Sequence, residues 1–163
     1  MLDPDLVLAA VISAFRSIPA LITQMAGASS NIYGHTYAYG AEHSLALAIN
    51  EQRSPSILVA YVDLIGGQFS GMTVWKHRLD AYIRPKNAAF GHIPGGAIAA
   101  SPQHLFWLMM NSPVLGGSQN IRYTEILSGL HMLDAMPSLT HQTDEQGADF
   151  FVCHMVFPEM GDA

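Results

Sequence analysis

Apolar residues recur at spacings of three and four near the start of the chain and predict a helix there. These positions are Leu6, Val7, Ala10, Val11, Ala14, Phe15 and Ile18. Asp3 is a typical N-cap residue, and Pro4 suits the first helical position because the first turn leaves its N–H groups unbonded. Pro19 interrupts the pattern, so we expect a second helical segment with Ser17 as its cap and Gly27 as its stop.

The middle of the chain has the patterns of two strands. Residues 56–65 (SILVAYVDLI) are almost continuously apolar, which is typical of a strand covered on both faces. Residues 72–84 alternate instead, which is typical of a strand with two different faces. One face holds Trp75, His77, Leu79, Ala81 and Ile83, and the other holds Val74, Lys76, Arg78, Asp80 and Tyr82. The glycines of residues 66–71 predict a hairpin turn between the strands.

Further helices and a second hairpin follow the same reasoning. Residues 42–50 and 102–110 have helical patterns, and Ser101 is a suitable cap for the second of them. Residues 138–143 and 148–157 flank a turn at Asp144-Glu145-Gln146-Gly147 and predict the second hairpin, whereas residues 111–137 have no clear pattern. This order predicts an α+β fold, with an antiparallel or mixed sheet of two hairpins and helices packed on one face.

The length predicts one domain over residues 1–163, and two segments within it stand apart in composition. Residues 27–40 (GASSNIYGHTYAYG) and residues 85–100 (PKNAAFGHIPGGAIAA) are rich in small and turn-forming residues. We expect both to be flexible loops or arms.

Composition favours a protein whose surface is partly covered by other subunits. Apolar residues make up 50% of the chain and charged residues only 12%, about half the usual share in globular proteins. A charge-poor, apolar surface is typical of subunit interfaces. The net charge of −6, with seven Lys and Arg, argues against specific nucleic-acid binding.

The start of the chain gives no sign of export. Residues 1–5 are acidic, where a secretory signal would be basic, and apolar runs such as residues 57–61 are too short to span a bilayer. We therefore expect a protein made in a cytoplasm, without a membrane partner.

Candidate residues for chemistry are few. No two of the eight histidines share the i, i+2 or i, i+4 spacing that places both on one face of a strand or helix. We expect His77 and His154 to be partly buried and hydrogen-bonded. Cys153 lies in an apolar strand, which is the setting of an inert thiol. We predict no catalytic, cofactor-binding or metal-binding residues, and no enzymatic activity.

The carboxylates leave two alternatives open. Asp144, Glu145 and Asp149 could hold a hard cation, although a solvated turn is the favoured interpretation. Asp63, near the end of an apolar strand, is the one carboxylate that could be buried, and the alternative is that it caps or pairs with Arg78 across the first hairpin.

The apolar patch of residues 106–110 (FWLMM) also has two interpretations. It is either a subunit contact or a core helix with one exposed Trp.

The order of elements and several short motifs resemble one family. A helix pair over residues 6–25 leads to Leu-Ala-Leu-Ala-Ile at residues 45–49 and to a strand, Pro-Ser-Ile-Leu-Val-Ala-Tyr, at residues 55–61. The next strand carries Trp75, His77 and Ile83-Arg84, and the last hairpin turns at residues 144–147 before Glu159. In these respects residues 5–159 resemble the tail terminator (tail completion) proteins of long-tailed bacteriophages. Residues 27–40 and 85–100 match this family least.

The resemblance implies a structural virion protein of the tail or neck, assembled in the host cytoplasm. Such a protein forms a homo-oligomeric ring, usually of six subunits, which caps the tail tube and joins it to the head–tail connector or neck proteins. It implies no catalytic residue and no cofactor. An acidic lumen would let DNA pass without binding it.

Contacts with neighbours are expected in the loops at residues 66–71 and 85–100 and in the arm at residues 27–40. The candidate interface residues are Tyr33, Tyr37, Tyr39, Gly66, Phe69, Phe90, Ile93 and Trp107. Two other functions remain open: a head–tail adaptor or tail-tube subunit of the same fold, and a small ligand-binding domain or enzyme that uses His77, Asp63 and the glycine loops.

Overall fold

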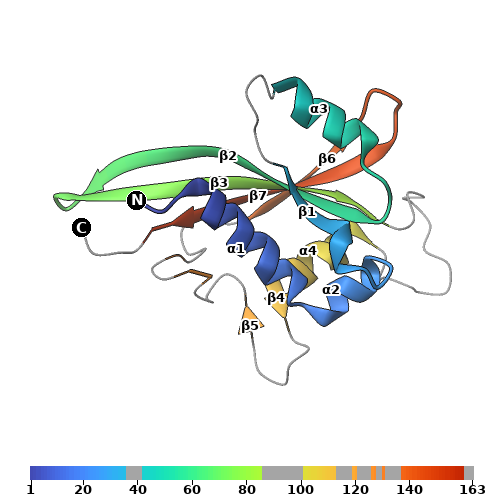
Figure 1. The fold of residues 1–163 in the computed structure, drawn as a ribbon, viewed down its shortest axis with the longest axis horizontal. Helices are drawn as coiled ribbons and strands as arrows, with labels where there is room; N and C mark the ends of the chain where they lie inside the picture. Colours follow the sequence, from blue (N-terminus) through green and yellow to red (C-terminus); the bar gives the residue numbers. More distant parts are fainter. Residues whose placement is uncertain are drawn as a thin grey trace.

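A five-stranded mixed sheet with helices against it is the frame of the protein in our computed structural model (Figure 1). The structure describes residues 1–35, 42–85, 101–112, 119–120, 126–127, 130 and 137–159. The helices are α1 (Pro4–Arg16), α2 (Pro19–Gln24), α3 (Glu42–Glu51) and α4 (Pro102–Met110), with a 3-10 turn at Ser29–Asn31. The predicted α+β class is confirmed.

The sheet has the order β1-β2-β3-β7-β6. Its strands are β1 (Ile32–His35), β2 (Ser56–Phe69), β3 (Met72–Arg84), β6 (Ser138–Thr143) and β7 (Asp149–Pro158). β1 runs parallel to β2, and all other neighbours are antiparallel. A second, two-stranded sheet joins β4 (Asn111–Ser112) to β5 (Gln119–Asn120). Both predicted hairpins therefore exist, and they meet where β3 pairs with β7.

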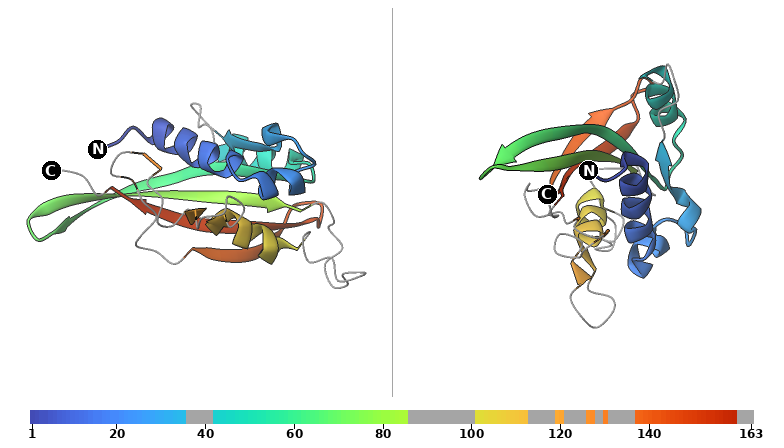
Figure 2. Two further views of the ribbon diagram at one scale, coloured as in Figure 1. Left: turned by 90° about the horizontal axis from the view of Figure 1, so that it is seen from below. Right: turned by 60° about the vertical axis from the view of Figure 1, so that its left-hand side comes forward.

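The core lies between one face of the sheet and helices α1, α2 and α4. Figure 2 shows α1 and α4 running along the sheet. The alternation predicted for β3 is confirmed, because His77, Leu79, Ala81 and Ile83 are all buried on this side. α1 contributes Val7, Leu8, Val11 and Phe15 to the same core, and β7 contributes Phe151, Cys153, Met155 and Phe157. Removing these apolar surfaces from water stabilises the fold.

The helix boundaries follow the predicted N-caps, with one exception. The Asp3 side chain accepts a hydrogen bond from the Asp5 N–H, and Ser101 accepts one from the His104 N–H, as expected of N-caps. Ser17, however, ends α1 and does not begin α2, whose N-cap is Ile18 without a side-chain bond. The apolar stripe of α1 differs from the prediction at two positions. Leu6, expected on the stripe, is exposed, whereas Leu8 is buried in the core.

Three strand predictions need correction. β2 continues to Phe69, so Gly66 and Gly67 belong to the strand, and the turn consists of Ser70 and Gly71 alone. Both turn residues have positive φ, 50° and 78°, as in the type I′ turns that suit the twist of a hairpin. Part of the predicted arm at residues 27–40 is the edge strand β1. Only the first half of β2, through Ala60, is buried on both faces.

The β2–β3 hairpin extends well beyond the rest of the sheet as a two-stranded ribbon (Figures 1 and 2). β1 pairs with β2 only at residues 57–60, and β7 pairs with β3 only at residues 76–83. We call residues 62–75 the arm. Residues 66–75 lie past the pairing with β7, and residues 62–65 lie past the pairing with β1. A bulge between Tyr61 and Asp63 marks its beginning, and bulges of this kind increase the local twist of a strand.

Candidate functional site

The arm presents apolar side chains to solvent. Ile65, Met72 and Val74 lie on one of its faces, because the register pairs Ile65 with Lys76, Gly67 with Val74, and Phe69 with Met72. Ile65 is 44% exposed and Met72 is 50% exposed, and Val62 in the bulge is 41% exposed. Surfaces of this kind, projecting from the body of a protein, are typical of sites that bind another macromolecule.

The far part of the arm also lacks the features that usually keep a strand edge free of partners. Residues 64–75 (LIGGQFSGMTVW) contain no charged residue and no proline. Exposed edges are normally protected by Lys, Pro or inward-pointing charges. The nearest ion pair lies at the base, where Arg78 Nη1 donates to Asp63 Oδ2 at 3.2 Å and both side chains are nearly half exposed. Asp63 therefore pairs with Arg78, as predicted in the alternative, and is not buried.

The other face of the arm is built around Gly66 and Trp75. A Cβ atom at Gly66 would lie 2.6 Å from Cζ3 of Trp75, so the indole ring covers the strand where a side chain would otherwise stand. A Cβ atom at the neighbouring Gly67 would meet nothing within 4 Å. The two glycines, adjacent in sequence, therefore have different roles.

Replacing Gly66 with Ala is expected to displace the indole of Trp75 toward water. In a Trp107→Phe background, Trp75 is the single tryptophan, and its fluorescence emission should shift to longer wavelength. Gly67→Ala is the matched control and should leave the emission unchanged. Identical spectra for both variants would show that the ring does not rest on Gly66.

A buried polar network lies at the base of the arm. His77, fully buried, is within 2.6 Å of the Tyr61 hydroxyl through Nδ1 and within 2.7 Å of Glu159 Oε2 through Nε2. The set is self-consistent if Nε2–H donates to the ionised carboxylate and Nδ1 accepts from the Tyr61 O–H. Both ring nitrogens then have partners, and His77 is a structural residue here, as its buried strand position predicted.

Glu159 connects this network to the start of the chain. Its Oε1 atom accepts from the Leu2 N–H at 3.0 Å and lies 3.5 Å from the N-terminal amine. Desolvation by itself raises the pKa of Glu159, but the Leu2 N–H, His77 and the N-terminal charge outweigh it and hold the pKa below its ordinary value of 4.5. Burial, with the nearby carboxylates of Asp63 and Glu159, raises the pKa of Tyr61 to about 12.

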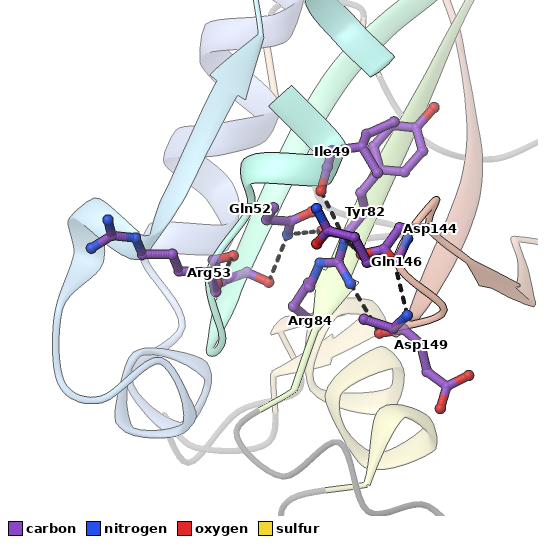
Figure 3. A network of polar contacts seen from close by, with 10 residues as sticks. Ile49, Gln52, Arg53, Tyr82, Arg84, Asp144, Gln146 and Asp149 are labelled. Atoms are coloured by element: carbon purple, nitrogen blue, oxygen red, sulfur yellow. Dashed lines mark hydrogen bonds and ion pairs between the residues drawn. The ribbon is translucent and has the colours of Figure 1, made fainter. Parts of the chain in front are cut away.

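A second polar network lies at the other end of β3 (Figure 3). Arg84 Nη2 donates to Asp144 Oδ2 and to the Ile49 carbonyl, both at 2.8 Å, and Nη1 donates to the Asp149 carbonyl at 3.3 Å. Its guanidinium also lies 5.2 Å from the centre of the Phe150 ring. Arg84 thus joins α3, β3 and the turn of the β6–β7 hairpin.

Asp144 is the anionic partner in this network and organises the hairpin turn. Its Oδ1 atom accepts from the N–H groups of Gln146 and Ala148, both at 2.9 Å. The Ala148 N–H is the largest of the effects that lower the pKa of Asp144, and Arg84 adds to it. The predicted solvated turn is confirmed for Glu145, which is exposed, whereas the Asp144 carboxylate is ion-paired with Arg84. His141 Nε2 donates a hydrogen bond to Asp149 Oδ1 at 2.6 Å.

The remaining candidates for chemistry have structural surroundings. Cys153 is buried in β7, and desolvation raises the pKa of its thiol to about 12, which confirms the prediction of an unreactive thiol. His154 is half-buried and contacts Asp80 at 2.8 Å and Thr140 at 3.2 Å. Among the described residues, no three His, Cys, Asp or Glu side chains are grouped in a way that suits a metal ion.

The predicted interface residues are not brought together as one surface. Tyr33 is half-buried in β1, and Gly66 and Phe69 lie in β2. Trp107 is 44% exposed on α4 and stacks on His104, with ring centres 5.8 Å apart. Its neighbours Leu108, Met109 and Met110 are buried, so the patch is a core helix with one exposed Trp. Tyr37, Tyr39, Phe90, Ile93 and the loop at residues 86–100 lie outside the described residues.

Sequence reasoning missed the exposed face of the arm and the pairing of Glu159 with His77. The first could have been suspected from the absence of charge between residues 64 and 75. The second had no local signal, since the two residues are 82 positions apart.

Comparison with protein-family models and with curated proteins finds no match for this chain. Its resemblance to the tail terminators therefore rests on the order of elements and on the motifs quoted above. No helix in the described part of the chain has the length and apolar character needed to cross a membrane.

Proposed function

We propose that this protein is a structural subunit that assembles with copies of itself into a ring, as the tail terminators of long-tailed phages do. In this role it would cap the tail tube and present a surface to the head connector or neck proteins. The observation that carries the proposal is the arm, an apolar two-stranded ribbon that extends past both neighbouring strands of its own sheet.

The arm has a physical reason to bind a partner. A two-stranded hairpin alone in water is marginally stable, because it buries little apolar surface and leaves both backbone edges solvated. Here one face of the ribbon exposes Ile65 and Met72. Contact with another subunit would bury these side chains and stabilise the ribbon, and the low charge of the chain as a whole supports the same interpretation.

The polar networks favour this function over the enzymatic alternative. His77, the residue on which that alternative depends most, already uses both ring nitrogens within the protein. Asp63 is paired with Arg78 on the surface, away from the His77 ring in the opposite face of the hairpin. These side chains stabilise the fold at the base of the arm. A structural subunit requires no catalytic role from them.

Light scattering after size-exclusion chromatography tests the proposal. The wild type is expected to have a mass that is a multiple of 17.6 kDa, with six subunits implied by the family resemblance. The double variant Ile65→Thr/Met72→Thr should be a folded monomer, because Thr keeps the strand propensity of the arm while removing its apolar surface. Added to polymerising tail-tube subunits, the wild type should stop tube growth and the double variant should not.

The double variant Leu6→Gln/Leu47→Gln is the matched control. It also removes two exposed apolar side chains, but from helices α1 and α3, and it should keep the wild-type mass. A wild-type protein that stays monomeric at high concentration and leaves tube growth unchanged would refute the proposed function. Loss of assembly in the control variant alone would instead place the contact on the helices.

A further inference from the structure

Three polar side chains from neighbouring strands meet on the face of the sheet opposite the core. Asp80 on β3, His154 on β7 and Thr140 on β6 each alternate with residues that pack into the core, so all three lie on the other face. Asp80 is directly opposite His154 in the register, and Thr140 follows two residues after Ser138, the partner of His154 on β6. Side chains placed in this way reach one another across the strands.

The contacts join a carboxylate, an imidazole and a hydroxyl in that order. His154 Nδ1 lies 2.8 Å from Asp80 Oδ1, and His154 Nε2 lies 3.2 Å from Thr140 Oγ1. An ionised carboxylate only accepts hydrogen bonds, so Nδ1 carries the proton of the neutral ring and donates to Asp80. Nε2 is then an acceptor, and the Thr140 O–H donates to it. A hydroxyl bonded to a base, which is oriented by a third group, is the arrangement of an activated nucleophile.

The reacting end of this arrangement is exposed, unlike the network around His77. The His154 side chain is 43% exposed and Thr140 is exposed, whereas the Asp80 side chain is only 18% exposed. His77 also lies between a hydroxyl and a carboxylate, but it is fully buried, so a reagent cannot approach it. A small electrophile can therefore reach the Thr140 oxygen while Asp80 keeps the imidazole of His154 oriented.

We propose that Thr140 is an acyl-accepting hydroxyl, with His154 as its general base and Asp80 as a positioning residue. Thr140 Oγ1 attacks the carbonyl carbon of a small activated ester or thioester while its proton moves to His154 Nε2. The bond between Oγ1 and the carbonyl carbon forms, and the bond from that carbon to the leaving oxygen or sulfur breaks. The leaving group takes the bonding electron pair and then the proton from Nε2.

The product is an O-acyl threonine, so the inference concerns modification of the protein and does not rest on its assembly into a ring. Thr140 and His154 lie on an exposed sheet face, where an ester is held by little beyond its reacting carbonyl group. Small esters with a good leaving group are therefore the class that fits, because they need the least stabilisation in the transition state.

Reaction of the full chain with para-nitrophenyl acetate, mapped by fragmentation mass spectrometry, tests the proposal. Thr143, another exposed threonine of β6, is the internal control in the same chain. The initial rate of O-acetylation should be about 100-fold higher at Thr140 than at Thr143, the lower limit for general acid–base catalysis. Equal rates at the two threonines would overturn the proposal, and this comparison within the wild type does not depend on whether any variant folds.

Variants separate the roles of the hydroxyl and the base. Thr140→Ser should keep the reaction, and His154→Gln should reduce acetylation of Thr140 to the rate at Thr143. Undiminished acetylation of Thr140 in His154→Gln would overturn the role of the imidazole. Release of nitrophenolate that survives in Thr140→Val but is lost in His154→Gln would make His154 the nucleophile and would also overturn the proposal.

Nitrogen NMR of the His154 ring tests the role of Asp80 without a reagent. At alkaline pH the wild type should carry the ring proton on Nδ1, and a proton on Nε2 would overturn the assignment of His154 as the base for Thr140. Asp80→Asn is expected to move the proton to Nε2, because a carboxamide can donate to Nδ1, and to slow the acetylation of Thr140. Full acetylation of Thr140 together with a proton on Nε2 would contradict the positioning role.

Discussion

Replacing Arg84 with Met is expected to destabilise the protein more than any other single change on its polar residues. The change leaves the Asp144 carboxylate without its cation and removes the donors that hold the Ile49 and Asp149 carbonyls. Removing one member of a buried ion pair costs about 3–5 kcal/mol. We expect Arg84→Met to lower the free energy of unfolding by about 3 kcal/mol, near the lower limit, because two backbone N–H groups still bind the carboxylate. Chemical denaturation monitored by circular dichroism measures the change.

Arg78→Met is the matched control for this experiment. It breaks the other Arg–Asp pair of β3, in which both side chains are nearly half exposed, and exposed pairs contribute about 0–1 kcal/mol. Equal effects of the two substitutions would mean that the Arg84 network does not join α3 to the β6–β7 hairpin as described. The comparison therefore separates the effect of burial from the effect of charge.

Acid is expected to weaken the attachment of the N-terminus at the base of the arm. The pKa of Glu159 is lower in the folded protein than its ordinary value of 4.5, so the ionised carboxylate stabilises the folded state. This stabilisation is fully present above pH 4.5 and is lost as the pH falls through the folded-state pKa. Glu159→Gln removes the titration, so its melting temperature should fall less than that of the wild type between pH 6 and pH 3 (roughly the range over which a carboxylate titrates).

Glu145→Gln is the control for this pH dependence, because Glu145 is exposed in a turn. This variant should follow the wild-type curve. If Glu159→Gln also follows the wild-type curve over the whole range, the hydrogen bonds of the ionised carboxylate to the Leu2 N–H and His77 do not stabilise the folded state in solution. At neutral pH the Gln variant should be less stable than the wild type, because it loses the charge that faces the N-terminal amine.

The two networks and the arm are parts of one arrangement along β3. Arg84 holds one end of this strand to α3 and to the β6–β7 turn. His77 holds the middle of the strand to Glu159, which follows β7 and binds the start of the chain. Beyond His77 the strand continues into the arm. Polar contacts therefore hold β3 to its neighbours near both ends of its pairing with β7. The arm begins beyond the contacts of His77.

The sequence by itself determined most of the secondary structure and the class of the fold. Period-two alternation in residues 72–84 correctly grouped His77, Leu79 and Ala81 on one face, which is the core side in the structure, because side-chain direction along a strand depends on the local backbone alone. The N-caps at Asp3 and Ser101 could also be predicted from the sequence, because each side chain accepts a hydrogen bond from a backbone N–H within three residues.

Only the tertiary structure decided where the hairpin leaves the body and which charges meet. Nothing in the apolar run of residues 56–65 shows that the pairing of β2 with β1 extends only to Ala60, because that limit is set by a separate segment of chain. The partners of Glu159, His77 and Arg84 are likewise distant in sequence. Local patterns specify which way a residue points, whereas exposure and ion pairing depend on which segments pack against it, and the packing is a property of the whole chain.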